Sequence, residues 1–412
     1  MPHVGIVLAG GAARGAYEVG VLQHLVTDVA RDLGHPLALD VICGSSAGAL
    51  HACALAAHAD ALEVGVAELA ARWSELDVHE ILRPDVAQCL ATIAHTLGLG
   101  AVCAALPQSG GLLDPGPVAK ILGRVPFERI DAHVRRGLLH GVALSATHVA
   151  SGRTVVFVQR TAALGADWHL DPTTVPRAAR MRARHALASA AMPFLFPAVR
   201  IGGESYCDGA LRQNVPLAPA LHLGADALLL VNPHYLEVQA PPARLARARE
   251  RGLPDAVFLL GKVLNALLLD RVDTDLARLE SLNAILSAGE RRFGAGFLPA
   301  LNEELGHAPG EGLRPVRSVL VRASQDIGVL AAELVRSPRF RDRTGTVLGH
   351  LLASLAAGEP RREADLLSYL LFDGEFAETL MALGRHDAAE QHEALCALFA
   401  CGAQGSRAPH AA

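Results

Sequence analysis

The pentapeptide Gly44-Ser45-Ser46-Ala47-Gly48 is the feature of the sequence with the clearest chemical meaning. It lies between an apolar run, 39–43, and an alanine-rich stretch, 49–57, so the pattern predicts a strand, a sharp turn and a helix. Such a turn needs small residues, here Gly44 and Gly48, and it aims one hydroxyl toward the N-terminus of the helix. Ser46 is therefore the candidate nucleophile, although small residues also gather at tight turns for packing reasons alone.

A glycine-rich segment, Gly10-Gly11-Ala12-Ala13-Arg14-Gly15, follows the first apolar run of the chain. Consecutive backbone N–H groups at the start of a helix can bind an anion, and in acyl transfer that anion is the oxygen of the tetrahedral intermediate. Arg14 adds a fixed positive charge nearby. A turn needed only for helix–strand packing is the plain alternative. A dinucleotide fingerprint through Gly10, Ala12 and Gly15 is disfavoured, because a Cβ at the middle position obstructs a pyrophosphate.

An aspartate that could act as the base lies in Tyr206-Cys207-Asp208-Gly209-Ala210. Its apolar and small neighbours would leave Asp208 partly desolvated, which raises the pKa of its carboxyl and lets it take a proton from Ser46. The plain alternative is a turn, because Asp-Gly pairs are common in turns.

Histidines offer a rival arrangement. His222 and His234 follow Asp208, as the Ser-Asp-His order of an α/β-hydrolase requires, but such enzymes place the serine after several strands and here it follows the second. His51 lies one turn beyond Ser46, and we expect it to be a packing residue or a residue of the polar helix face. The sequence thus favours Asp208 over a histidine as the base.

The order of these elements resembles the patatin-like phospholipase family. The segment 188–197, Ala-Ser-Ala-Ala-Met-Pro-Phe-Leu-Phe-Pro, is similar to a family segment ahead of the aspartate, and Gly224-Ala225-Asp226 is similar to a motif before a late strand. The resemblance covers about residues 3–235. It implies an α/β fold, namely a three-layer α/β/α sandwich with a mainly parallel sheet.

The resemblance also implies roles for individual residues. Ser46 and Asp208 would form a catalytic dyad without a histidine, and the substrate would be a lipid or phospholipid ester. Ala12 stands where the family often has glycine, but alanine still donates its N–H. The N–H groups implied for the oxyanion hole belong to Gly10, Gly11, Ala12 and Ala47. The supporting motif residues are Arg14, Gly15, Gly44, Gly48 and Gly209.

Composition limits the other partners. The formal net charge of −5 gives no basic field, which argues against nucleic acid. The seven scattered cysteines include no C-x-x-C pair, and the N-terminus lacks the basic start of a signal peptide, so we expect a cytoplasmic protein. Charged residues or histidines interrupt every apolar stretch, so any membrane contact would be peripheral, at the inner membrane face. No metal-ligand spacing or Walker loop is present, and no cofactor is implied.

Strands and helices alternate along most of the chain. Runs at 4–9, 39–43, 138–146, 154–159, 225–231 and 314–321 predict strands, and stretches at 16–33, 62–99, 177–191, 215–224 and 255–286 predict helices. We expect a catalytic domain over residues 1–335 and an α-helical extension over 336–412 with a disordered tail. Asp373-Gly374 is interpreted as a turn within that extension.

Three stretches could contact a substrate or membrane. An insertion that begins after residue 62 could cover the nucleophile, and the apolar helix within 257–268 could be a lid, although a core helix is the simpler interpretation. Two arginine groups, 177–184 and 244–251, are either solvated faces or phosphate sites.

The sequence therefore predicts a serine lipid acyl hydrolase of the phospholipase A or lysophospholipase type. Two alternatives stay open. The same acyl-enzyme could pass its acyl group to an acceptor other than water, or the loop could belong to a nucleotide-binding or lipid-binding module in which Ser46 is inert.

Overall fold

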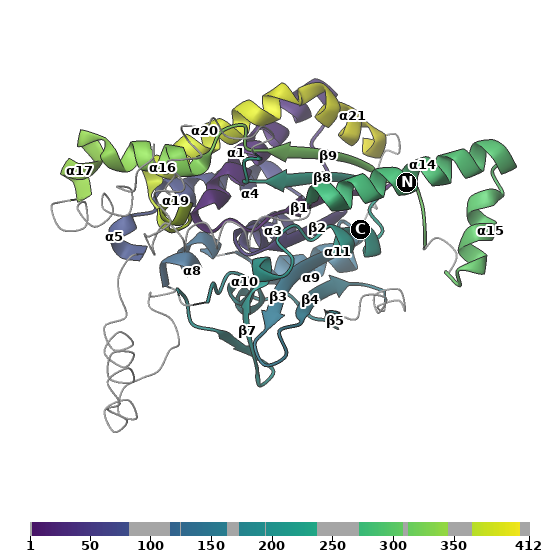
Figure 1. The fold of residues 1–412 in the computed structure, drawn as a ribbon, viewed down its shortest axis with the longest axis horizontal. Coiled ribbons are helices and arrows are strands. Elements are labelled where there is room, and N and C mark those ends of the chain that lie inside the picture. Colours follow the sequence, from purple (N-terminus) through teal and green to yellow (C-terminus); the bar gives the residue numbers. More distant parts are fainter. Residues whose placement is uncertain are drawn as a thin grey trace, which may run out of the picture.

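A single twisted β-sheet forms the centre of the computed structural model (Figure 1). The structure describes residues 2–81, 116–123, 125–162, 173–193, 195–236, 272–307, 312–344 and 365–403. The main path of the sheet has the order β5-β4-β3-β2-β1-β8-β9, and β7 pairs with β3 and β6. The strands are β1 Val4–Leu8, β2 Val41–Ser45, β3 Gly141–His148, β4 Thr154–Arg160, β5 Thr174–Ala178, β6 Val199–Ile201, β7 Glu204–Asp208, β8 Ala227–Asn232 and β9 Arg317–Arg322.

The centre of the sheet is parallel, as expected. Strand β1 pairs in parallel with β2 and β8, β2 pairs in parallel with β3, and β8 with β9. Antiparallel pairs occur where β3 meets β4 and β7, and where β6 meets β7. The carboxyl ends of β1 and β2 therefore lie side by side, and the residues that follow them, the glycine-rich segment and the elbow, share one edge of the sheet.

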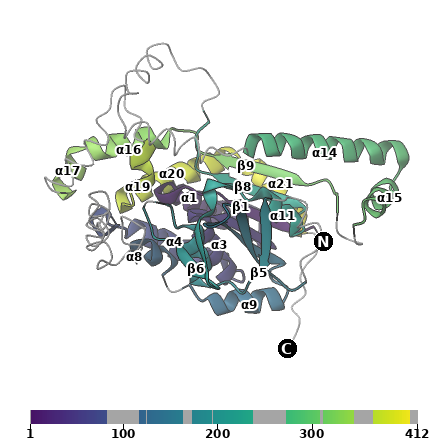
Figure 2. The ribbon, with the colours of Figure 1, turned by 60° about the horizontal axis from the view of Figure 1, so that its bottom comes forward.

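Helices cover both faces of this sheet and complete a three-layer α/β/α sandwich (Figures 1 and 2). The N-terminal half contains the 3-10 turn η1 Ala12–Gly15, α1 Ala16–His24, the π-helical turn Leu25–Val29, α2 Ala30–Leu33, α3 Ala47–Ala57, α4 Leu62–Ser74, α5 Val78–Ile81, α8 Gly116–Leu122 and α9 Phe127–Arg135. The other half contains α10 Ala183–Ser189, η4 Gly209–Leu211, α11 Leu217–His222, α14 Val272–Phe293, α15 Phe297–Glu304, α16 Ile327–Arg336, α17 Pro338–Thr344, α19 Asp365–Leu370, α20 Gly374–Glu390 and α21 His392–Ala403.

Side chains of the central strands alternate between two apolar cores. On β1, Ile6 and Leu8 face a core shared with α1, α3 and α20, whereas Val7 faces a core shared with α11 and α14. Because both faces are buried, each central strand is a continuous apolar run, which is why these strands could be recognised from sequence.

The C-terminal helices pack directly on the N-terminal ones. Helix α20 crosses α1 so closely that a Cβ on Gly20 would lie 2.0 Å from the carbonyl oxygen of Met381. The Tyr17 hydroxyl donates to Asp387 at 2.9 Å, and Phe376 and Leu380 belong to the same core as α1. The boundary near residue 335 stays a prediction, but the helices beyond it share the core of the sheet.

The prediction of a helix over 177–191 is wrong in its first half. Thr174–Ala178 forms the strand β5 beside β4, and the helix α10 begins only at Ala183. Arg177 therefore lies on a strand, where it forms an ion pair with Glu204 and a hydrogen bond with Tyr206. The predicted arginine face of one helix does not exist.

Other expectations lie outside the described residues. These are most of the insertion after residue 81, the arginine group at 244–251, the apolar helix within 257–268 and the tail from residue 404. The expected turn at Asp373-Gly374 is in fact the N-terminus of α20, where the Asp373 side chain accepts a hydrogen bond from the N–H of Glu375.

Candidate active site

The elbow at Ser46 is a tight turn between β2 and α3. Ser46 has φ 52° and ψ −123°, a conformation that residues with a side chain rarely adopt, and the serine is buried. The turn has no room beside it, because a Cβ on Gly44 would lie 2.3 Å from the carbonyl oxygen of Gly48, and a Cβ on Gly48 would lie 2.3 Å from that of Leu8. The small residues of the pentapeptide are therefore a steric requirement.

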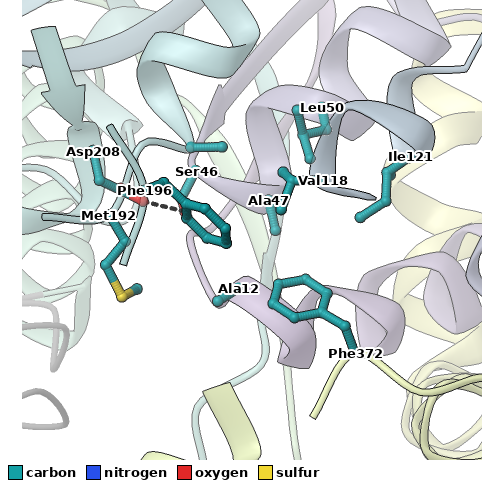
Figure 3. Close-up of a pocket in the computed structure, with 11 residues that line it drawn as sticks. Ala12, Ser46, Ala47, Leu50, Val118, Ile121, Met192, Phe196, Asp208 and Phe372 are labelled. Carbon is teal, nitrogen blue, oxygen red and sulfur yellow. Dashed lines mark hydrogen bonds between the residues drawn. The ribbon is translucent and has the colours of Figure 1, made fainter. Parts of the chain in front are cut away.

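Strand β3 fixes the nucleophile relative to Asp208. Ser45 is in register with Ser145 of β3, and Asp208, at the end of β7, is in register with the next residue, Ala146. The Ser46 Oγ donates a hydrogen bond of 2.7 Å to Asp208 Oδ2 (Figure 3). Sheet pairing thus brings together two residues that are 162 positions apart in the sequence.

The Asp208 carboxyl is buried, and burial raises its pKa to about 7. Hydrogen bonds from Ser46 and from the backbone of Ala210 act in the opposite direction, because they stabilise the carboxylate. The Ala210 N–H bonds Oδ1 at 2.8 Å, which leaves Oδ2 directed at the serine. A carboxyl with a pKa near neutrality can both accept and return a proton.

Ser189 is a residue whose role the sequence did not reveal. Its hydroxyl accepts a 2.9 Å hydrogen bond from the N–H of Ser46 and donates one of 2.6 Å to the carbonyl oxygen of Ser145. It therefore ties the strained turn to β3. The only signal for it was its place in the segment 188–197, which gave it no function.

The glycine-rich segment passes beside the nucleophile. A Cβ on Gly10 would lie 3.0 Å from that of Ser46 and 2.5 Å from Oδ1 of Asn214. The N–H of Gly10 donates to the carbonyl oxygen of Asn214 at 3.1 Å, so the expectation that this N–H faces an oxyanion is not met. Ala12 has φ 47°, in the left-handed region that favours glycine.

Arg14 is not among the residues that line the pocket at Ser46. Its side chain is buried, with its Nε bonded to the Ser368 hydroxyl and its guanidinium paired with Asp365, both on α19. Gly15 lies where the segment meets the elbow helix, since a Cβ there would be 2.7 Å from that of Ala47.

An apolar pocket opens at the serine (Figure 3). Ala12, Ser46, Ala47 and Asp208 are among the residues that line it. The other lining residues are apolar: Leu50, Val118, Ile121, Ala190, Met192, Phe196 and Phe372. Phe372 follows α19 and stacks on Trp73, with the ring centroids 6.1 Å apart. Its contribution had no signal in the sequence.

The histidines have other partners. His51 is fully buried between Glu18, 2.7 Å from its Nδ1, and the Trp73 indole N–H, which donates to its Nε2 at 2.9 Å. His234 contacts Asn232 and Tyr369. Among the hydrogen bonds of the described residues, none joins a histidine to Ser46, which favours Asp208 as its partner.

Within the described ranges, no three histidine, cysteine, aspartate or glutamate residues are grouped as ligands for a metal ion. No helix in the described part of the chain combines the length and the apolar character needed to cross a bilayer.

Comparisons with known proteins show the family of the chain. The family described as "Patatin-like phospholipase" matches residues 6–221. A curated relative from Pseudomonas aeruginosa, named "cGAMP-activated phospholipase", is 30% identical over 223 residues, which are 53% of this chain and 56% of the relative. The chain thus matches just over half the length of that relative. The crystal structure of VipD from Legionella pneumophila aligns with 89% of this chain and 67% of its own, at 14% identity and a TM-score of 0.30, too low to support an argument.

Proposed function

Because the chain belongs to the patatin-like phospholipase family, we propose that it is a serine lipid acyl hydrolase in which Ser46 and Asp208 act as a dyad. The family supports hydrolysis of lipid esters. The observation that carries the assignment of residues is the 2.7 Å hydrogen bond from Ser46 Oγ to Asp208 Oδ2. No other side chain in the described part of the chain bonds the Ser46 hydroxyl.

The proposed reaction has two halves. Asp208 takes the hydroxyl proton while Ser46 Oγ attacks the ester carbonyl, and the protonated Asp208 then gives that proton to the departing alkoxide. In the second half, Asp208 takes a proton from water, the hydroxide attacks the acyl-enzyme, and Ser46 recovers its proton as the fatty acid leaves. A base with a pKa of about 7 is suited to both directions of transfer.

The oxyanion hole is assigned to the N–H groups of Gly11, Ala12 and Ala47. Ala12 and Ala47 line the pocket with Ser46, and Ala47 is the first residue of α3, where N–H groups have no acceptor within the helix. Gly10 is excluded because its N–H is bonded to Asn214. Removal of one such donor typically costs about 10²- to 10³-fold in rate.

The apolar lining supports a fatty acyl chain as the group next to the ester. Among the described residues that line the pocket, only Ser46 and Asp208 have polar side chains, and the others are apolar. An acyl chain gains about 0.8 kcal/mol for each buried methylene group. A phospholipase A or lysophospholipase activity fits this lining.

The test is hydrolysis of a short-chain p-nitrophenyl ester and of a phospholipid by the purified chain, with Ser46→Ala and Asp208→Asn in parallel. We expect both variants to lose at least about 10³-fold in kcat, and fluorophosphonate labelling to disappear in Ser46→Ala. Wild-type activity in either variant would refute the dyad. Added lyso-lipid would reveal acyl transfer as a new diacyl product. Absence of both labelling and hydrolysis in the wild type would favour a binding module.

A further inference from the structure

The glycine-rich segment is held from the far end of the chain. The Arg14 Nε donates a 2.8 Å hydrogen bond to the Ser368 hydroxyl, and its Nη2 lies 3.3 Å from Asp365 Oδ1. The guanidinium also lies over the ring of Tyr369, 3.9 Å from the centroid. All three partners are on α19, more than 350 residues from Arg14 in the sequence.

Burial makes these contacts restrictive. The Arg14 side chain is only 4% exposed and that of Asp365 only 6%. A buried charge is stable only where its partners compensate for the hydration that it loses. Because the guanidinium is planar and its donors are fixed, it can bond these partners in one orientation. The Ser368 hydroxyl is itself fixed, because it donates to the carbonyl oxygen of Asp365 at 2.6 Å. Arg14 therefore has one arrangement when α19 is in place.

Helix α19, which holds Arg14, is itself hydrogen-bonded to the central sheet through His234. Tyr369 contacts His234 Nε2 at 3.0 Å, and His234 Nδ1 contacts Asn232 Oδ1, at the end of β8, at 2.9 Å. Burial lowers the pKa of His234 to about 3, so the ring is neutral. Because the Asn232 oxygen can only accept, Nδ1 carries the hydrogen and Nε2 accepts from the Tyr369 hydroxyl. Helix α19 is thus fixed to the strand beside β1.

Arg14 is two residues beyond Ala12, within the turn η1. The backbone of Ala12 is in the left-handed region, a conformation that alanine itself disfavours. The surrounding contacts must therefore hold it there, and a contact two residues later can determine where the Ala12 N–H points. The segment after α19 also supplies Phe372 to the pocket. One C-terminal segment therefore contacts both the glycine-rich segment and the acyl pocket.

We propose that Ser368 and Asp365 are positioning residues for the oxyanion hole, acting through Arg14; this rests on the proposed function. They touch neither substrate nor Ser46. Their effect is to hold the N–H groups of Gly11 and Ala12 where the negative oxygen develops, so they should matter more in the transition state than in substrate binding.

The experiment uses the full chain with Ser368→Ala, Asp365→Asn and, as a matched control, Thr379→Ala on the exposed face of α20. Active sites are titrated to completion with a fluorophosphonate, so that kcat is expressed per reactive serine. We expect Ser368→Ala to lower kcat about 10- to 100-fold with KM within about twofold, since small misplacements of catalytic groups cost about that much. Asp365→Asn should do the same, and Thr379→Ala should not.

A trifluoromethyl ketone forms an adduct with serine that carries an oxyanion, so its affinity reports on the oxyanion hole. It therefore distinguishes a role in positioning the N–H groups from a role in the stability of the fold alone. Its inhibition constant should rise in Ser368→Ala by about the factor by which kcat/KM falls. Unchanged ketone affinity and kcat per titrated serine in both α19 variants would overturn the inference. If Ser368→Ala yields no folded protein, the same two measurements on Asp365→Asn test the inference. Loss of labelling and activity in the wild type would instead refute the proposed function.

Discussion

The candidate site has an elbow half, Ser46 with Asp208, and a proposed oxyanion half, Gly11 with Ala12, and the two are held in different ways. The elbow half is fixed by adjacent strands, because Ser46 is bonded to Ser189 and Asp208, and both are fixed to β3. The oxyanion half is fixed by a helix near the other end of the chain, through Arg14. The contact between Ser46 and Asp208 can therefore form with the sheet, whereas the glycine-rich segment is also held by a C-terminal helix.

Both halves store backbone strain. Ala12 and Ser46 are the non-glycine residues with positive φ in the described part of the chain, and both line the pocket. Such conformations persist only where their surroundings enforce them, and they concentrate at functional sites. Each half thus contains one residue with a strained, positive φ under a different restraint, and substitutions at Ser46 and Ala12 can compare the two.

The largest effect is expected from the buried base of the elbow half. The pKa of Asp208 is about 7 in the folded protein, against an ordinary value of 3.8. A raised pKa stabilises the fold below pH 4, and this contribution, up to about 4 kcal/mol, is lost as pH rises through 7. Asp208→Asn removes the charge and should remove that part of the pH dependence. Urea unfolding of both proteins from pH 4 to pH 8 measures how the free energy of unfolding changes with pH. The same pH dependence in the wild type and in Asp208→Asn would contradict the expectation.

The same pKa governs activity. Because Asp208 must be ionised to act as a base, wild-type kcat/KM should rise tenfold per pH unit on the acid side and level off near pH 7. A pH–rate profile with an ester of fixed charge checks it. A plateau that extends unchanged down to pH 5 would contradict a raised pKa for the catalytic carboxyl of Asp208.

The next effect concerns the contact between the two halves. A Cβ on Gly48 would meet the carbonyl oxygens of Leu8 and Ala9, at the end of the strand that leads into the glycine-rich segment. We expect Gly48→Ala to cost about 3 kcal/mol of unfolding free energy, because backbone must move. Gly34→Ala is the control, with φ +74° and nothing within 4 Å of the added Cβ. It should cost about 1 to 2 kcal/mol, and an equal cost for the two variants would mean that the elbow is less crowded than its geometry indicates.

The sequence indicated the elbow half far better than the oxyanion half. Gly44, Ser46 and Gly48 carry a local pattern, because a tight turn restricts the residues that make it, and the buried strands beside it are plain apolar runs. Arg14 was visible as a positive charge, but nothing local distinguishes Ser368 from other serines. Its role depends on a contact across 354 positions, which periodicity does not encode.

The error at 177–191 has a related cause. The stretch around Arg177 has a helix-compatible composition, yet its first part pairs with β4 as the strand β5. Tertiary pairing therefore overrides the local preference for a helix. Asp208 was identified as the candidate base from its motif and its place in the order of elements, whereas its distance to Ser46 depends on the register of β3.

A smaller effect compares strain directly. At φ 52° and ψ −123°, Ser46 is outside the left-handed region that alanine can enter, so Ser46→Gly should be more stable than Ser46→Ala by about 1 kcal/mol after the entropy of glycine is allowed for. Both variants should be inactive. Chemical denaturation of the pair measures the difference, and an alanine variant as stable as the glycine variant would show that the elbow relaxes once the hydroxyl is gone.

The smallest effect is expected at Ala12. Glycine relieves the strain of φ 47° but adds chain entropy of similar size, so Ala12→Gly should change stability by less than about 1 kcal/mol. Because Arg14 holds the segment two residues later, kcat should change by less than about threefold. In the Ser368→Ala background that restraint is weakened, and the added freedom of glycine should then cost more than the single variants combined. Additive effects on kcat in this cycle would mean that the oxyanion half is held locally, as the elbow is.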